Sequence, residues 1–213
     1  MKCGISKMIK KCPLCDSNEI INHHYVNYGK YPFKTSRCGN CGFIFMNPRF
    51  NRKTIDSFYT DEYYSGKAEY SYIDERTVYE YSSHVWDARI RNIRKFVSSG
   101  KFLDVGCAFG GFLSRASKYY TVYGVEISDY SSSYARSHFG INVHTGTIEN
   151  TKFKKETFSV ITMIEMIEHI SDPMSLLLKC CELLHDKGVL VIQTADMDGW
   201  QAINAGEKYH YYL

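Results

Sequence analysis

The stretch that decides the fold is Phe102-Leu103-Asp104-Val105-Gly106-Cys107-Ala108-Phe109-Gly110-Gly111-Phe112. Its first four residues have the character of a strand, its glycines allow a tight turn, and the residues from Phe112 onward have the character of a helix. A strand, a glycine loop and a helix in this order are typical of a ligand-binding turn in an α/β fold. The chemistry of the ligand must come from the residues around the loop.

The spacing of the loop glycines argues against a phosphate site. Gly106 and Gly110 form G-x-x-x-G, with Ala108 where a dinucleotide fingerprint has its middle glycine, and no Gly-Lys-Ser/Thr follows as in a P-loop. Asp104, just ahead of the loop, would repel a pyrophosphate but would suit a cationic amino-acid tail. Glu126 comes 20 residues after Gly106 at the end of the next predicted strand, where a carboxylate can bind two ribose hydroxyls.

Alternating elements after residue 100 predict a doubly wound, mostly parallel sheet of the Rossmann-like type. We expect strands at 102–105, 121–126, 141–144, 159–164 and 189–194, and helices near 111–119, 130–138 and 173–184. In such sheets the ligand lies at the carboxyl ends of the strands. The segment 146–149 follows the third strand and can flank an adenine ring. A nucleoside, a ribose diol and an ammonium-bearing tail together describe S-adenosylmethionine.

These motifs closely resemble those of class I S-adenosylmethionine-dependent methyltransferases, over about residues 100–200. The resemblance rests on the segments 103–110, 125–126, 146–149 and 164–173. It implies methyl transfer to a small-molecule acceptor, such as a sugar, a polysaccharide precursor or a natural-product intermediate. It also implies a cofactor site in which Asp104, Gly106 and Gly110 line the methionine tail, Glu126 binds ribose, Thr147 and Ile148 contact adenine, Glu165 opens the loop near the methyl group, and Cys107 and Ile127 complete the set.

The candidate catalytic residues are Glu168 and His169, at the strand end toward which the methyl group should point. A base is needed only if the acceptor must lose a proton, and histidine can act near neutral pH. The alternative is that residues 168–173 are a structural connection in which Asp172 caps the next helix. A second alternative is that Glu165, Glu168 and His169 share a divalent ion.

The first part of the chain carries two C-x-x-C pairs, Cys12 with Cys15 and Cys38 with Cys41. Two such pairs predict a closed tetrahedral Cys₄ site, which makes a bound zinc ion structural rather than catalytic. The alternative is a redox pair or a coincidence. Residues 20–31, between the pairs, read as short strands and a turn, so we expect a zinc ribbon over residues 1–47. A segment this short needs the metal to fold.

Residues 48–99 are expected to form an aromatic-rich connector that ends in an amphipathic helix, ahead of the methyltransferase domain at 100–213. The helix should run from Trp86 toward Gly100, with Arg89 on its exposed side. The connector tyrosines suit either a lid over the cofactor or packing between the two parts, and neither interpretation is favoured. The residues concerned are Tyr59, Tyr63, Tyr64, Tyr70, Tyr72, Tyr79 and Tyr81, with Phe58 beside them.

The net charge of +3 conceals an asymmetry, because residues 1–100 carry 16 Lys and Arg against 10 Asp and Glu. That surplus is not a basic stripe, so nucleic acid is not the favoured partner. Two alternatives remain: an RNA methyltransferase whose ribbon holds the substrate, which a basic, aromatic face around the cysteines would favour, and a non-catalytic protein that binds the cofactor or a partner. The residues do not predict an oligomeric state.

No segment reaches the ~18 apolar residues of a membrane span, and the first residues lack the apolar core of a signal peptide, so we expect a cytoplasmic protein. The end of the chain departs from the family pattern. Family members close the sheet with a further hairpin after the strand at 189–194, and 19 residues, 195–213, follow it here. We therefore expect a domain truncated at its C-terminus.

Overall fold

The computed structural model describes residue 4 and residues 8–26, 32–67 and 73–209. The chain divides into two compact units. The cysteine unit comprises the residues up to 59 together with 172–174 and those from 195 onward. The sheet unit comprises residues 60–171 and 175–194.

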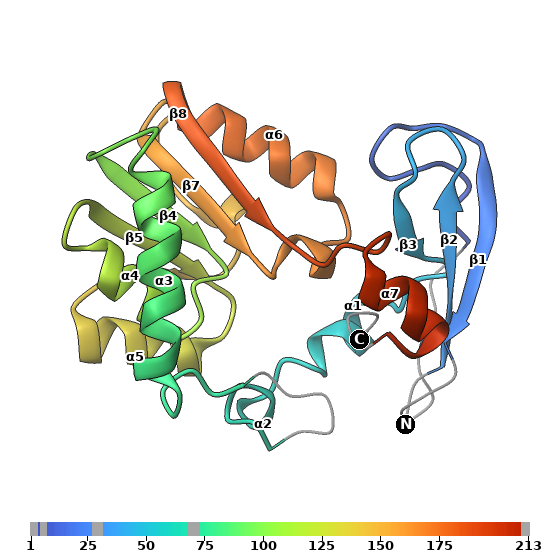
Figure 1. Cartoon of the computed structure of the whole chain (residues 1–213), viewed down its shortest axis with the longest axis horizontal. Helices are drawn as coiled ribbons and strands as arrows, with labels where there is room; N and C mark the ends of the chain where they lie inside the picture. Colours follow the sequence, from blue (N-terminus) through green and yellow to red (C-terminus); the bar gives the residue numbers. More distant parts are fainter. Residues whose placement is uncertain (1–3, 5–7, 27–31, 68–72, 210–213) are drawn as a thin grey trace. The chain divides into compact units, whose positions relative to one another are not determined.

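The sheet unit is built on five parallel strands in the order β6-β5-β4-β7-β8 (Figure 1). From β4 the chain moves one way through β5 to β6, and then continues on the other side with β7 and β8. The order therefore reverses between β4 and β7, and this α/β architecture confirms the predicted fold class. The strands are β4 (Lys101–Val105), β5 (Thr121–Glu126), β6 (Asn142–Thr145), β7 (Phe158–Ile164) and β8 (Leu184–Gln193).

Helices cover both faces of this sheet (Figure 1). On one face α3 (Tyr79–Ile93), α4 (Gly111–Ala116) and α5 (Asp129–Phe139) pack against a core that contains Phe102 and Val160. On the other face α6 (Pro173–Leu183) packs against a second core that contains Leu103 and Ile161. Because β4 is buried on both faces, its side chains do not alternate between core and solvent: Phe102, Leu103, Asp104 and Val105 are all buried.

Several element boundaries differ from the sequence prediction, most of all those of α3 and β8. Helix α3 begins at Tyr79, ahead of the predicted start at Trp86, because the Tyr79 ring packs edge-on against Trp86 at 5.3 Å and extends the buried face by two turns. It ends at Ile93, short of Gly100. Strand β8 begins at Leu184 rather than Val189, because the intervening turn-forming residues form an irregularity in its pairing with β7.

The cysteine unit contains a three-stranded antiparallel sheet of β1 (Ile20–Val26), β2 (Phe33–Cys38) and β3 (Ile44–Met46). Strand β1 confirms a strand in the predicted segment 20–31, whereas β2 lies after that segment, and residues 27–31 lie outside the described part of the chain. The unit also holds α1 (Arg52–Asp56), α7 (Trp200–Ala205) and the 3₁₀ helix η3 (Gly206–Lys208). Asn51 caps α1 by accepting a hydrogen bond from the Thr54 N–H at 2.9 Å.

Over the described residues, no helix combines the length and the apolar character needed to cross a lipid bilayer.

Gly110 tests how tightly the loop is packed against α5. Its φ is +81°, and a Cβ there would lie 2.9 Å from the Ala135 Cβ. Gly140 has a similar φ of +67° with open space around it, so Gly140→Ala should cost only the backbone strain of about 1–2 kcal/mol. We expect Gly110→Ala to cost a further 1–3 kcal/mol or so through overpacking, measured by urea unfolding. Equal losses in the two variants would contradict this account.

Candidate functional site

The glycine loop lies at the reversal of strand order, between the ends of β4 and β7. Gly106 has φ +83°, and a Cβ at this position would come within 2.7 Å of the Met166 Cγ in the loop after β7. The Gly106 N–H also bonds to the Val125 carbonyl at 2.8 Å, which ties the loop to β5. Gly106 is therefore required both by its left-handed backbone and by the close approach of the β7 loop.

Glu126, at the end of β5, faces the glycine loop and is 4% exposed. Its Oε2 accepts a hydrogen bond from the Ala108 N–H at 2.9 Å, and its Oε1 accepts from the Ser128 N–H at 2.9 Å and from the Tyr64 hydroxyl at 3.0 Å. Burial raises the pKa of Glu126, while these donors oppose the rise. The structure thus brings a hydrogen-bonded carboxylate to the place where the sequence predicted the ribose ligand.

Asp104, at the end of β4, is also 4% exposed and accepts a hydrogen bond from the Thr162 hydroxyl at 2.5 Å. Burial raises the pKa of Asp104 to about 6, against the opposing effects of Thr162 and of the Arg89 guanidinium.

Arg89 is half-buried rather than on the exposed side of its helix, which corrects the sequence prediction. It interacts electrostatically with Asp104 and Glu165 and donates to the Gln193 Oε1 at 2.7 Å.

The sequence prediction grouped Arg89 with Arg91 and Arg94 as exposed basic residues, although Arg89 lies three residues after Trp86 and four before Ile93, on the flank of the buried stripe. Arg91 and Arg94 are exposed, as predicted. Helical spacing could therefore have indicated that Arg89 is partly buried, but the acidic side chains that it meets are set by the packing of α3 on the sheet. Its cation lies opposite two acidic side chains at the carboxyl ends of β4 and β7, so it could hold a carboxylate there.

Glu165, directly after β7, has φ +50°, a left-handed backbone that non-glycine residues rarely adopt. Its Oε1 accepts a hydrogen bond from the Gln193 Nε2 at 2.8 Å, and its Oε2 is buried with no hydrogen-bond partner in the described part of the chain. A strained residue with a buried, unsatisfied carboxylate oxygen is typical of a functional site and fits a ligand with a polar group.

Glu168 and His169 belong to the 3₁₀ helix η2 (Ile167–His169), which follows Glu165. Burial raises the pKa of Glu168, and the Glu165 carboxylate adds to the rise, while Thr194 opposes it by hydrogen bonding. Burial lowers the pKa of His169, against the attraction of Glu165. The three residues do not converge as metal ligands: among the described residues, only the four cysteines do so.

The predicted adenine contacts lie where the loop after β6 begins. The Gly146 N–H bonds to the Glu126 carbonyl at 2.8 Å and so joins this loop to the end of β5. Thr147 is half-buried, Ile148 is buried at the start of the 3₁₀ helix η1 (Ile148–Asn150), and Ile127 is exposed. The structure thereby collects the predicted cofactor residues at one end of the sheet.

Cys107 and the start of α4 have environments unlike those of the other predicted cofactor residues. Cys107 is buried among core side chains, and burial raises the pKa of its thiol well above the ordinary value. The first N–H of α4, that of Gly111, donates to the Glu75 Oε1 at 3.1 Å. Because a carboxylate already fills the position that an anion would take at this helix terminus, the loop is not arranged as a phosphate cradle.

The connector tyrosines have different environments. Tyr64 is buried at the end of α2 (Asp61–Tyr64), where it reaches Glu126, and Tyr63 lies near the same carboxylate. Tyr79 packs against the core of the sheet unit, and Tyr81 is 78% exposed. Tyr59 lies in the cysteine unit, whereas Tyr70 and Tyr72 fall outside the described residues. Among the connector tyrosines that the structure describes, only those of α2 therefore lie close to Glu126.

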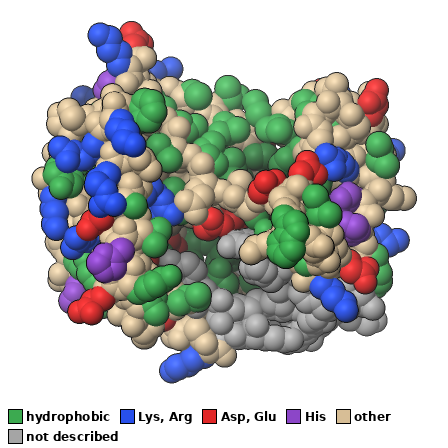
Figure 2. Space-filling model, in the orientation of Figure 1, with side chains coloured by type: hydrophobic (Ala, Val, Ile, Leu, Met, Phe, Trp, Pro, Cys, Tyr) green, Lys and Arg blue, Asp and Glu red, His purple; other side chains and the backbone are tan. Residues whose placement is uncertain are grey.

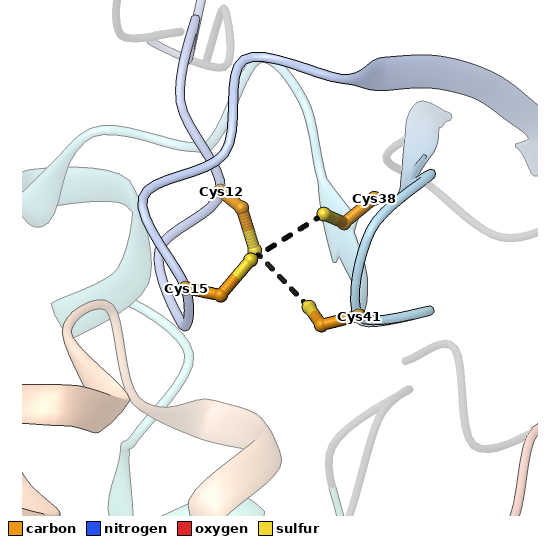
Figure 3. A group of neighbouring side chains, drawn as sticks. All are labelled: Cys12, Cys15, Cys38 and Cys41. Carbon is orange, nitrogen blue, oxygen red and sulfur yellow. Dashed lines mark hydrogen bonds between the residues drawn. The ribbon is translucent and has the colours of Figure 1, made fainter.

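The four cysteines of the first unit form a separate candidate metal centre (Figure 3). Their Sγ atoms all lie within 4.8 Å of one another. The Cys12–Cys41 and Cys15–Cys38 pairs each have an Sγ–Sγ distance of 3.6 Å. A tetrahedral site with Zn–S bonds of about 2.3 Å would space its sulfur atoms about 3.8 Å apart, so the geometry fits zinc.

Donors around the sulfur atoms support the same fit. The Ser17 N–H and the Asn40 side chain, whose Nδ2 lies 3.6 Å from Sγ, lower the pKa of Cys15 to about 6. Burial raises the pKa of Cys41 to about 12. Donors to sulfur of the kind found at Cys15 favour the thiolate form that a metal ligand requires.

Comparison with known proteins establishes the family. A family model described as a methyltransferase domain matches residues 55–212. The chain belongs to this family of S-adenosylmethionine-dependent methyltransferases, which confirms the class predicted from the sequence.

Individual relatives match only part of the chain. A ubiquinone biosynthesis O-methyltransferase from Actinobacillus pleuropneumoniae is 35% identical over 123 residues, covering 51% of this chain and 52% of that protein. One from Parvibaculum lavamentivorans is 35% identical over 131 residues, covering 58% and 49%. The chain thus spans about half the length of the curated relatives it matches. Among solved structures, the PH0226 protein from Pyrococcus horikoshii has a TM-score of 0.49 and 20% identity, covering 67% of this chain and 66% of that one.

Asp104→Asn should change how stability depends on pH. Burial raises the pKa of Asp104 to about 6, so between its unfolded pKa near ~4 and this value the folded chain holds a proton that the unfolded chain releases. Wild-type stability therefore falls as pH rises through this window. The asparagine variant lacks this loss, so it should gain up to about 3 kcal/mol relative to wild type between pH 4 and 7 in urea unfolding. A difference that does not vary with pH would contradict the raised pKa.

Proposed function

We propose that the sheet unit binds S-adenosylmethionine and transfers its methyl group to a small-molecule acceptor. The observation that carries the proposal is the buried Glu126 carboxylate, which is bonded to the Ala108 N–H of the glycine loop at the end of β5. A carboxylate in this position suits the two hydroxyls of a ribose. Family membership supports the same cofactor.

The methionine tail carries both an ammonium and a carboxylate, and the residues present match both charges. Asp104 is the buried acid at the end of β4 and would hold the ammonium group. Arg89, which faces Asp104 and Glu165, would hold the carboxylate. The unsatisfied Oε2 of Glu165 adds a further acceptor at this place.

When bound, S-adenosylmethionine supplies an electrophilic methyl group on a sulfonium. Transfer is an in-line displacement, so the protein contributes mainly alignment and exclusion of water. We assign to His169 the removal of a proton from the acceptor, because burial lowers the pKa of His169 and favours the neutral imidazole near pH 7. Glu168, whose pKa burial raises, is the second candidate for holding that proton.

The names of the relatives and the sequence motifs both bear on the class of acceptor. The curated relatives are named as O-methyltransferases, which supports a hydroxyl group as the methylated function. The sequence prediction of a sugar, polysaccharide precursor or natural-product intermediate is a narrower proposal. A hydroxyl-bearing small molecule satisfies both.

An RNA acceptor is less well supported. Exposed basic side chains gather on the α3 face of the sheet unit (Figure 2), where Arg91, Arg94 and Lys95 are exposed. Near the cysteines, Lys11 is paired with Asp16 at 2.9 Å, and Arg37 is paired with Asp198 at 3.2 Å. Because these cations are paired with acidic side chains, they contribute less to the basic surface that RNA binding at the ribbon requires.

In the cysteine unit we propose a structural zinc ion bound by the four thiolates, within a zinc ribbon formed by the surrounding strands. A closed Cys₄ set leaves no position for a substrate, so the metal would stabilise the fold rather than take part in catalysis.

Glu126→Ala should weaken binding of S-adenosylhomocysteine by about 100-fold, because charge-assisted hydrogen bonds to the ribose are lost. Isothermal titration calorimetry measures the affinity. Glu80→Ala removes an exposed glutamate from α3 and serves as the matched control, with an affinity equal to that of wild type. Wild-type affinity in Glu126→Ala would contradict the site.

The same preparations separate binding from turnover. Labelled S-adenosylmethionine is incubated with phenolic and with sugar acceptors, and label on either set supports transfer to a hydroxyl. If the protein binds S-adenosylhomocysteine but transfers label to none of these acceptors, the result would instead favour a cofactor-binding protein that is not an enzyme.

Cys38→Ser should abolish the zinc stoichiometry of one ion per chain that we expect in native mass spectrometry, because a three-thiolate set leaves the shell open. Cys181→Ser is the control, since Cys181 is an exposed cysteine outside the cluster. A zinc-free wild-type chain, or zinc retained in Cys38→Ser, would exclude the proposed ligand set.

A further inference from the structure

Tyr64 makes a contact that the proposed function does not require. It is 5% exposed and ends α2, and its hydroxyl donates to the Glu126 Oε1 at 3.0 Å. Its ring meets the edge of Phe109, in the glycine loop, with centroids 6.3 Å apart. A side chain from the connector therefore already forms a hydrogen bond with the carboxylate that the cofactor would use.

The acceptor positions of Glu126 are already filled. A carboxylate offers about four lone-pair directions. The Ala108 and Ser128 N–H groups take two, the Tyr64 hydroxyl takes a third, and the Ile127 N–H also faces the group. A ribose hydroxyl needs one of these acceptor positions. The N–H donors belong to the loop and to the strand end, so Tyr64 is the donor that can leave without unfolding the site.

We propose that the Tyr64 hydroxyl occupies the position of a ribose hydroxyl on Glu126, and that α2 is a gate which S-adenosylmethionine must displace in order to bind. The inference rests on the proposed function, because it assigns to Glu126 the ribose of that cofactor. The exchange replaces one O–H donor by another, so the carboxylate keeps its hydrogen bonds in both states.

The construction of α2 suits such a displacement. It has four residues, its N-cap Thr60 makes no side-chain capping bond, and Gly66 with φ +73° follows its end. So short a helix has little stability of its own and depends on its contacts. Its second tyrosine, Tyr63, is half-buried, and the pKa of Tyr63 is raised by burial and by the charges of Glu126 and Glu168. Displacing α2 would therefore uncover the ribose position and also the approach to Glu168.

The neighbouring segment is held more firmly, so the movement can be confined to α2. Arg76 lies over the Phe109 ring at 4.1 Å and is paired with Asp74 at 2.7 Å. Glu75 bonds to the Gly111 N–H at the start of α4. These contacts fix residues 74–76 to the glycine loop whether or not Tyr64 remains on Glu126.

The test compares the affinity of S-adenosylhomocysteine for wild type and for Tyr64→Phe by calorimetry. Removing the hydroxyl keeps the ring but weakens the closed state, so binding should tighten by about tenfold as the competent fraction rises. Tyr120→Phe is the matched control, because its hydroxyl donates to the Val97 carbonyl at 2.5 Å, away from the site. Unchanged or weaker binding in Tyr64→Phe would overturn the gate, since a tyrosine that helps to hold the ribose predicts the opposite sign.

Hydrogen exchange gives a second readout on the wild-type chain. The amides of Tyr64 and Ser65 bond to the carbonyls of Thr60 and Asp61 at 3.4 and 3.0 Å. Adding S-adenosylhomocysteine should speed their exchange if α2 is displaced, and slower or unchanged exchange would contradict displacement. Failure of both wild type and Tyr64→Phe to bind would contradict the proposed function itself, together with the gate, whereas binding with the wrong sign contradicts the gate alone.

Discussion

The sheet unit depends on one buried carboxylate, that of Glu126. Its two oxygens accept hydrogen bonds from the glycine loop, from the start of α5 and from α2, so three segments distant in sequence meet on one side chain. Burial penalises the charged form, and the surrounding donors offset that penalty. Because Glu126 joins these segments at the carboxyl end of β5, it identifies the site more clearly than the glycines do.

The second constraint is the reversal of strand order between β4 and β7. It brings Asp104 and Glu165 to the same end of the sheet, and α3 places Arg89 opposite both. Two acids and one guanidinium cation at this end of the sheet form a charge arrangement that suits a zwitterionic tail. The left-handed backbone of Glu165 belongs to the same arrangement, because such strain persists only where the surroundings hold it.

The cysteine unit is stabilised by a different kind of interaction. Its sheet has three strands, and its four thiols converge at distances close to those of a zinc–thiolate tetrahedron. The N–H groups that point at sulfur prepare Cys15 to act as a thiolate. A metal in this position would supply stability that so small a core lacks.

The sequence by itself determined the parallel α/β class, the cysteine quartet and the positions of Asp104, Gly106 and Glu126, because each depends on local spacing or on residues at strand ends. It placed Arg89 on the wrong side of α3 and left the role of the connector tyrosines open. Those points depend on which face of a helix meets which strand end, and on which of several tyrosines reaches a carboxylate 62 positions away. Packing between distant segments decides such contacts, so only the tertiary structure shows that Arg89 faces Asp104 and that Tyr64 bonds to Glu126.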